Sequence, residues 1–241
     1  MNLSKKTITI SEVFGPTLQG EGPLIGRPTL FVRTGGCDFR CTWCDSMHAV
    51  DEKQHGEEWE EMLPEAVMEL LLDRSGGFPM LVTLSGGNPA TQPLDELIAI
   101  GRGHGYTFAL ETQGTIARPW FANLDHLVLS PKGPSSKMPF RAEKLTECVQ
   151  AAQGKPETAL KLVVFDDADY NFARDLAESR PELPMYLQAG TSQKKPGAAL
   201  MGEDILKRMR WLAEKVSADR WTEVTVLPQL HVLMWGDERG V

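Results

Sequence analysis

Three closely spaced cysteines are the part of this sequence best suited to chemistry. Cys37, Cys41 and Cys44 lie within one short segment, and the fourth cysteine, Cys148, lies far along the chain. In a reducing compartment such a cluster indicates metal binding or catalysis and not disulfides. Thiolates are the usual ligands of iron–sulfur clusters. Three thiolates would hold three irons of a four-iron cluster, and the fourth iron could then chelate the amino and carboxylate groups of a methionine moiety.

Two other interpretations of these cysteines stay open. His48 follows shortly after Cys44 and could complete a zinc site of three cysteines and one histidine. Alternatively, the three thiols are ordinary buried side chains. Cys148 lies in a helical stretch and belongs to no motif, so we interpret it as a core thiol.

Two features near the cysteines favour the cluster. Gly86 and Gly87 follow an apolar strand, where glycine lets the backbone approach a ligand closely, although such a pair is often only a turn. Trp43 lies between Cys41 and Cys44 and is suited to packing on an adenine ring. A core or interface aromatic is the alternative interpretation of Trp43.

Apolar, β-branched runs alternate with amphipathic stretches along the chain, which predicts strands that alternate with helices. Strands are predicted at residues 8–14, 30–33, 80–84, 107–111, 126–130, 159–165, 185–189 and 221–227. Helices are predicted at 64–72, 93–101, 141–152, 167–179 and 201–216. This order predicts an α/β fold with a largely parallel sheet. About six βα units would form a partial, open (β/α)6-type barrel, in a single domain over residues 1–241.

Unusual polar and glycine-containing clusters follow several predicted strands, at residues 85–87, 111–114, 130–132 and 188–190. Function in barrels of this kind gathers at the carboxyl ends of the strands. We therefore expect these clusters to meet the cysteine loop at one end of the barrel. The stretches 132–138 and 192–200 are expected to be loops.

Composition narrows the class of protein. The chain has 241 residues, is 41% hydrophobic and carries a net charge of −8, which is ordinary for a soluble globular domain. The negative charge argues against a broadly basic nucleic-acid surface. No segment approaches the roughly 20 apolar residues of a membrane span, and the polar start lacks the apolar core of a signal peptide. We therefore expect a cytoplasmic protein that binds neither nucleic acid nor membrane.

The whole set of motifs resembles a known family. The cysteine spacing with Gly86–Gly87 and the following Asn-Pro resembles the radical S-adenosylmethionine superfamily. Within it, the chain is similar to the 7-carboxy-7-deazaguanine synthases, the ring-contracting enzymes of the queuosine pathway. The resemblance covers essentially the whole chain and is carried by residues 12–22, 26–28, 31–37, 110–115, 129–132, 227–231 and 235–241.

The resemblance implies a lyase reaction. The substrate would be 6-carboxy-5,6,7,8-tetrahydropterin, which is rearranged to 7-carboxy-7-deazaguanine with loss of ammonia. A 4Fe–4S cluster on Cys37, Cys41 and Cys44 would cleave S-adenosylmethionine to the radical that takes a hydrogen from the substrate. S-adenosylmethionine is then regenerated, and Mg²⁺ is also required.

Positions matched to the family give expected roles. Ser46 would be the Mg²⁺ ligand. The substrate would be bound by an arginine fork for its carboxylate and by loop, hydroxyl and terminal groups: Arg33, Leu18, Gln19, Gly20, Ser85 and Val241. S-adenosylmethionine would be bound by Trp43, Cys44, Asp45, Gly87, Ser130, Pro131, Lys132, Gln188, Ala189, Gly190 and Thr191. Glu111 is a further candidate partner of the ribose or pterin.

One position departs from some relatives. Asn88 stands where those relatives carry Glu. The change removes a charge near the expected cofactor ammonium, so a side-chain salt bridge at this position is not predicted.

Two other functions compete with the lyase. One is a radical activase that acts on a protein partner, which would not need the pterin-binding segment 18–21. The other is a zinc-binding interaction module without catalysis. For the lyase, the resemblance implies a homodimer and a low-potential electron donor of flavodoxin or ferredoxin type.

Overall fold

The computed structural model describes residues 6–191, 201–236 and 238–241 of the chain, without the side chains of residues 201–203. The loop predicted at 192–200, the polar start up to Lys5 and Asp237 of the 235–241 motif lie outside the described residues. None of the described helices is long and apolar enough to cross a membrane.

The sheet has nine strands in the order β3-β1-β2-β4-β5-β6-β7-β8-β9. From β2 onward, neighbouring strands are parallel, whereas β1 pairs antiparallel with both β2 and β3. The strands are β1 (Ile8–Leu18), β2 (Pro28–Thr34), β3 (Glu60–Met62), β4 (Leu81–Gly86), β5 (Thr107–Thr112), β6 (His126–Leu129), β7 (Glu157–Val164), β8 (Met185–Ala189) and β9 (Val224–Leu227). Within the described ranges no pairing joins the edge strands β3 and β9, so the barrel is open as predicted.

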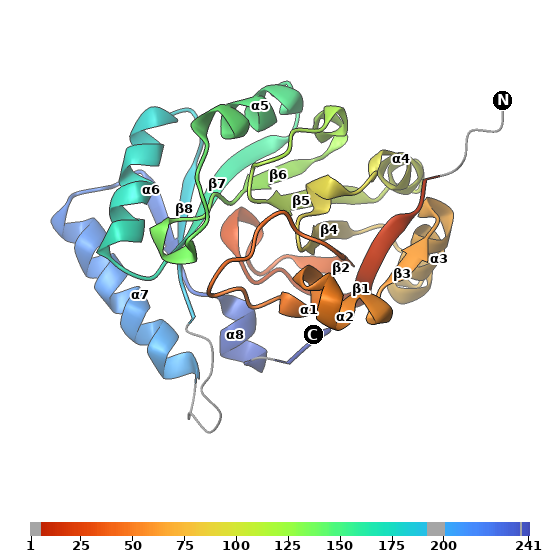
Figure 1. The fold of residues 1–241 in the computed structure, drawn as a ribbon, viewed down its shortest axis with the longest axis horizontal. Coiled ribbons are helices and arrows are strands. Elements are labelled where there is room, and N and C mark those ends of the chain that lie inside the picture. Colours follow the sequence, from red (N-terminus) through yellow and green to blue (C-terminus); the bar gives the residue numbers. More distant parts are fainter. Residues whose placement is uncertain (1–5, 192–200, 237) are drawn as a thin grey trace.

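Helices connect most of the parallel strands and lie outside the curved sheet (Figure 1). The crossovers are α3 (Pro64–Ser75), α4 (Asp95–Gly103), α5 (Ala142–Ala152), α6 (Asp167–Ser179) and α7 (Met201–Ala218). The β5–β6 connection is an exception, because it contains only the 3₁₀ helix Pro119–Asn123. Local signals mark the ends of α3: Pro64 occupies its first turn, and Gly76 ends it with a left-handed φ of 61°.

The two faces of the sheet differ in character, as alternate residues of β7 show. Leu160, Leu162 and Val164 belong to the hydrophobic core between the sheet and the helices. Lys161 and Val163 point to the opposite, inner face and line a cavity. Side chains alternate across a strand, so each parallel strand presents one row to the core and one row to the inner side of the barrel.

Several short elements differ from the sequence prediction. β3 was not predicted, because Glu60–Met62 is brief and polar and becomes a strand only by pairing with β1. The short helix α8 (Leu230–Trp235) was also missed, as were α1 (Met47–Val50) and α2 (Glu52–His55). Of these, α1 and α2 contact each other and lie near the C-terminus in Figure 1, whereas α8 contacts the outer helix α7. A strand predicted from residue 221 begins only at Val224.

Candidate functional site

The inner side of the barrel contains a cavity of about 320 Å³. That volume lies within the usual range for sites that hold small molecules. Its walls come from the inner faces of β1, β2, β5 and β7, from the cysteine loop, and from the chain around α8. Segments distant in sequence therefore surround one space, at the carboxyl ends of the parallel strands.

All three clustered cysteines line this cavity, and none of the four cysteines of the chain is in a disulfide. Burial raises the pKa of each clustered thiol, to about 11 for Cys44, where the nearby Asp45 carboxylate adds to the effect. A hydrogen bond to a distant segment holds the cysteine loop in place, since the Trp43 indole donates to the Ser135 hydroxyl at 2.9 Å. For Cys37 and Cys41 the nearby Lys132 charge opposes this rise but does not outweigh burial, so these two thiols hold their protons until a metal binds.

The spacing of the thiols bears on the zinc alternative. Three side chains, Glu21, Asp45 and His231, have potential metal-ligating atoms within 4.8 Å of one another. They are the only group of three or more such side chains in the described part of the chain. Tetrahedral zinc with Zn–S bonds of about 2.3 Å would hold its sulfurs about 3.8 Å apart. The sulfurs of the three cysteines do not all lie within 4.8 Å of one another, so they are too far apart for such a site. His48 is also engaged elsewhere, 3.1 Å from Glu12. The arrangement therefore disfavours the zinc site.

Gly86 and Gly87 pack against the cysteine loop. A Cβ on Gly86 would meet the backbone of Thr34, and one on Gly87 would meet the carbonyl of Gly36. The Asn88 N–H donates to that same carbonyl at 2.8 Å. The absence of side chains at these glycines thus lets the β4 turn support the start of the loop.

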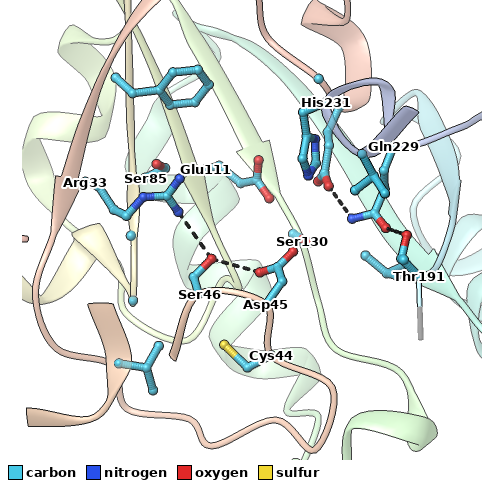
Figure 2. Close-up of a pocket in the computed structure, with 18 of the residues that line it drawn as sticks. Arg33, Cys44, Asp45, Ser46, Ser85, Glu111, Ser130, Thr191, Gln229 and His231 are labelled. Carbon is cyan, nitrogen blue, oxygen red and sulfur yellow. Dashed lines mark hydrogen bonds between the residues drawn. The ribbon is translucent and has the colours of Figure 1, made fainter. Parts of the chain in front are cut away.

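Arg33 anchors one end of the cavity (Figure 2). Its Nε lies 2.6 Å from Glu12 Oε1, and its Nη1 donates to Ser46 Oγ at 3.2 Å. The Ser46 hydroxyl donates in turn to Asp45 at 2.8 Å. Burial raises the pKa of Glu12, but the His48 hydrogen bond and the Arg33 charge outweigh it and hold the pKa below its ordinary value. Glu12 therefore stays ionised and orients the guanidinium.

Ser85 lies beside Arg33 on the same wall. Its hydroxyl oxygen is buried and has no hydrogen-bond partner within the described residues. A buried polar atom without a partner costs free energy. The orphaned hydroxyl therefore indicates a place where a ligand would supply the missing hydrogen bond.

A buried ion cluster forms the opposite part of the cavity. Lys161 is 2% exposed and forms short ion pairs with both Glu21 and Glu111. Burial alone would raise the pKa of Glu21, but the Lys161 charge outweighs it and lowers the pKa to about 2. Burial would lower the pKa of Lys161, yet the two carboxylates raise it above its ordinary value. Glu21 and Lys161 are therefore both charged at neutral pH.

The Glu21 carboxylate also ties the chain around α8 to the barrel. The Gln229 amide donates to Glu21 at 2.7 Å and accepts from the Thr191 hydroxyl at 2.5 Å (Figure 2). The Leu230 N–H donates to the Gly20 carbonyl at 2.9 Å. Because Lys161 and Gln229 already use the Glu21 oxygens, we assign no metal to the Glu21, Asp45 and His231 set.

Aromatic and basic side chains form the third wall. Trp43 contacts Phe165 with ring centroids 5.1 Å apart, and the Lys132 amine lies 5.8 Å from the Trp43 ring. Lys132 donates to the Ser130 hydroxyl at 3.0 Å. This wall can pack against a flat ring and offers one positive charge beside it.

Comparison with known proteins decides the family. The 7-carboxy-7-deazaguanine synthase of Bacillus subtilis is 41% identical over 248 residues, which cover 98% of this chain and 99% of the relative. The enzyme of that name from Bacillus cereus is 39% identical over 237 residues, which cover 97% and 99%. The chain belongs to the 7-carboxy-7-deazaguanine synthase family. No family model matches the sequence.

A solved structure supports the fold of this family member. The crystal structure of QueE from Escherichia coli superposes with a TM-score of 0.67 and covers 93% of this chain and 95% of that one. Its sequence identity is only 23%, so the match shows a shared fold. It confirms the predicted open α/β barrel.

Most residues expected to bind ligands in this 7-carboxy-7-deazaguanine synthase family member meet at the cavity. They include groups from every wall: Leu18, Gln19, Gly20, Arg33, Cys37, Cys41, Trp43, Cys44, Asp45, Ser46, Ser85, Gly87, Ser130, Lys132, Thr191 and Val241. Four others do not line it, namely Pro131, Gln188, Ala189 and Gly190. Gln188 is fully buried behind the wall, where it accepts from the Gly22 N–H at 3.1 Å and donates to the Pro228 carbonyl.

Sequence reasoning missed several side chains of the wall: Glu12, Phe14, Glu21, Phe31, Gln113, Lys161, Phe165, Gln229 and His231. For Lys161 a signal existed, because a charged residue interrupts the apolar run of β7. Gln113, Gln229 and His231 stand inside segments that resemble the 7-carboxy-7-deazaguanine synthases, but the resemblance implied no role for them. Glu21 belongs to the segment 18–21 expected to bind the pterin, but its ion pair with Lys161 was not expected.

Proposed function

We propose that this protein is a 7-carboxy-7-deazaguanine synthase. It would convert 6-carboxy-5,6,7,8-tetrahydropterin to 7-carboxy-7-deazaguanine with loss of ammonia, using S-adenosylmethionine, a 4Fe–4S cluster and Mg²⁺. One observation carries the proposal: in a chain of this family, three thiols that are in no disulfide share a cavity with an oriented arginine and a buried Lys–Glu cluster. Such a cavity suits a small ligand that has a carboxylate at one end and a polar ring at the other.

The residues present fit the iron–sulfur cluster. Three thiols of one loop, none of them in a disulfide, face the same space, and they are not gathered at the spacing that zinc requires. Cys37, Cys41 and Cys44 would hold the cluster. When bound, the cluster supplies the electron that cleaves S-adenosylmethionine and so starts the radical reaction. The protein's own part is to hold the reactants together and exclude water.

Arg33 is the proposed partner of the substrate carboxylate. A guanidinium binds a carboxylate through two parallel hydrogen bonds. Glu12 fixes the Nε side of the fork, so the fork is oriented before the substrate arrives. Ser85, with its orphaned hydroxyl on the same wall, would donate to the same end of the substrate.

Ser46 is the proposed Mg²⁺ ligand, and its contacts allow this role. Its proton faces Asp45, and one lone pair accepts from Arg33. A hydroxyl oxygen has two lone pairs, so one stays available. Mg²⁺ prefers oxygen ligands and keeps several waters, which the Asp45 carboxylate could bind.

The loop that follows β1 is proposed to bind the pterin ring. Gln19 is buried, and its side-chain oxygen accepts from the Glu21 N–H at 3.1 Å, which leaves the amide protons for a ligand. Backbone groups of Leu18 and Gly20, the Glu111 carboxylate and Val241 line the same space. Together they offer both donors and acceptors, as a pterin edge requires.

The third wall is proposed to bind S-adenosylmethionine. Trp43 would pack on the adenine, and Cys44, Asp45, Gly87, Ser130, Lys132 and Thr191 would surround the rest of the molecule. Pro131, Gln188, Ala189 and Gly190 would support this wall from behind. A flavodoxin- or ferredoxin-type donor, a homodimer and a cytoplasmic location remain part of the proposal.

An anaerobic assay tests the function. The reconstituted protein is incubated with carboxytetrahydropterin, S-adenosylmethionine, Mg²⁺ and a reductant, and the deazapurine product is measured by mass spectrometry. We expect product and about four irons per chain. Replacing any one of the three clustered cysteines by Ala should abolish both, whereas Cys148→Ala should retain the iron. A brown protein that cleaves S-adenosylmethionine without forming product would refute the substrate, and a colourless, zinc-containing protein would refute the cluster.

A further inference from the structure

Gln113 is a buried side chain at the end of β5 that contacts the first cysteine of the loop. It is 7% exposed, and its Nε2 lies 3.5 Å from Cys37 Sγ and 2.5 Å from Asp38 Oδ1. The backbone N–H of Phe39 also donates to the same sulfur, at 3.4 Å. Cys37 therefore accepts from a side chain that belongs to a different part of the barrel.

The orientation of the Gln113 amide is determined by its neighbour. An ionised carboxylate only accepts hydrogen bonds, so the NH₂ group of Gln113 must face Asp38. The same NH₂ group has a second proton, and it points to the Cys37 sulfur. Flipping the amide would place its oxygen against both a carboxylate and a sulfur, and both contacts would be lost.

Asn88 holds Asp38 from the other side. Its Nδ2 donates to Asp38 Oδ1 at 2.8 Å, and its Oδ1 accepts from the Thr112 hydroxyl at 2.7 Å and from the Ala90 N–H at 3.2 Å. Asn88 is fully buried and does not line the cavity. Its hydrogen-bonding groups are thus used to join β4, β5 and the cysteine loop, and not to bind a ligand.

We propose that Gln113 is a positioning residue for the cluster, on the basis of the proposed function, and that its N–H···S contact to Cys37 stabilises the reduced state. Hydrogen bonds to the sulfur ligands are among the factors that set the potential of an iron–sulfur cluster. Reduction adds negative charge to the cluster and its thiolates, which strengthens a hydrogen bond from an amide. Asn88 and Asp38 contribute by keeping the amide in place.

The test compares two glutamines. Gln113→Leu removes the contact to Cys37 and the bond to Asp38. Gln92→Leu is the matched control, because Gln92 also holds the base of the cysteine loop but bonds to none of the thiols. Its Nε2 donates to the Gly35 carbonyl at 3.0 Å, and its Oε1 accepts from the Thr9 N–H at 3.1 Å. Each reconstituted protein is analysed for iron content and for its midpoint potential by a redox titration followed by electron paramagnetic resonance.

We expect Gln113→Leu to keep its iron and to shift the midpoint potential to a more negative value, whereas Gln92→Leu leaves the potential unchanged. Gln113→Asn, which is too short to reach the sulfur, should shift it in the same direction and serves if the Leu variant fails to fold. An unchanged potential in iron-loaded Gln113→Asn, or an equal shift in Gln92→Leu, would overturn the proposal. A wild-type protein without a reducible cluster would instead refute the proposed function.

Discussion

At the scale of single residues, Lys161 makes the sharpest prediction. It neutralises two carboxylates, Glu21 and Glu111, inside the barrel. Lys161→Met keeps the length of the side chain but leaves both acids without their partner, which should cost about 3–5 kcal/mol of unfolding free energy near neutral pH. The measurement is urea unfolding of the protein at a series of pH values.

The pH dependence of this variant should have the opposite sign to that of the wild type. In the wild type, the folded-state pKa of Glu21 is lowered from 4.5 to about 2. The contribution of Glu21 to the unfolding free energy is therefore complete above pH 4.5 and is lost as the pH falls towards 2. Without Lys161, burial raises the pKa of Glu21, and acidification towards pH 5 should stabilise the variant. Lys144→Met, which breaks an exposed pair with Glu147, should change stability by less than about 1 kcal/mol. Parallel pH profiles for wild type and Lys161→Met would contradict the ion cluster.

Arg33 carries a second prediction at this scale. Arg33→Ala should weaken substrate binding by about 2–3 kcal/mol, on the order of a hundredfold in affinity, because charged hydrogen bonds to the carboxylate are lost. Iron content should stay unchanged, since the Arg33 guanidinium contacts Glu12, Ser46 and the Phe14 ring and bonds to none of the clustered thiols. Arg102→Ala removes an exposed arginine paired with Asp125 and is the matched control. Loss of iron in Arg33→Ala would show a structural role instead.

At the scale of elements, the turn after β4 supports the cysteine loop through its two glycines. Gly87→Ala would place a methyl group against the Gly36 carbonyl and 2.9 Å from the Ala49 carbonyl. Backbone atoms cannot give way as a flexible side chain can, so we expect a loss of about 1–3 kcal/mol in stability and a lower iron content after reconstitution.

The control for Gly87 lies in α4. Gly103 has no atom within 4 Å of an added Cβ and no left-handed φ, so Gly103→Ala should leave both stability and iron unchanged or raise stability slightly. Unchanged iron in Gly87→Ala would show that the loop does not depend on the turn.

How much of this could be predicted from the sequence depended on the kind of element. The helix α6 was predicted because its own periodic residues bury one face, and β8 was predicted because it is a short, almost wholly buried run. β3 and α8 were missed because each is short and is held mainly by partners, β1 for β3 and the Gly20 carbonyl for α8. No helix was predicted between the strands at 107–111 and 126–130, and the structure has only a short 3₁₀ helix there.

The residues of the candidate site also fall into those that could be identified from the sequence and those that could not. Cys37 stands in a motif with a recognisable spacing, and Ser46 was named from the resemblance to the family. Lys161 and Glu12 act because strand alternation and barrel curvature point them inward, towards residues from other strands. Gln188 shows the reverse case: its segment matches the family, but its side chain is used to join Gly22 and Pro228 behind the wall.

At the scale of the whole molecule, the cavity is closed by two segments from opposite ends of the chain. The loop at residues 19–26 contacts the start of α8 through the Gly20 carbonyl, Gln229 and Glu21. Both segments line the cavity, and α8 also contacts the outer helix α7. A ligand that touches both should therefore stabilise them together.

Hydrogen–deuterium exchange tests this coupling in the reconstituted protein. Adding S-adenosylmethionine and carboxytetrahydropterin should slow amide exchange in residues 19–26 and in α8 to a similar degree, while α4 on the outer face is unaffected. Gly20→Ala should break the coupling, because its Cβ would lie 2.9 Å from both the backbone nitrogen and the Cβ of His231. In that variant the 19–26 loop should keep part of its protection and α8 should lose it. Protection of only one segment in the wild type would show that the two ends of the chain close the cavity independently.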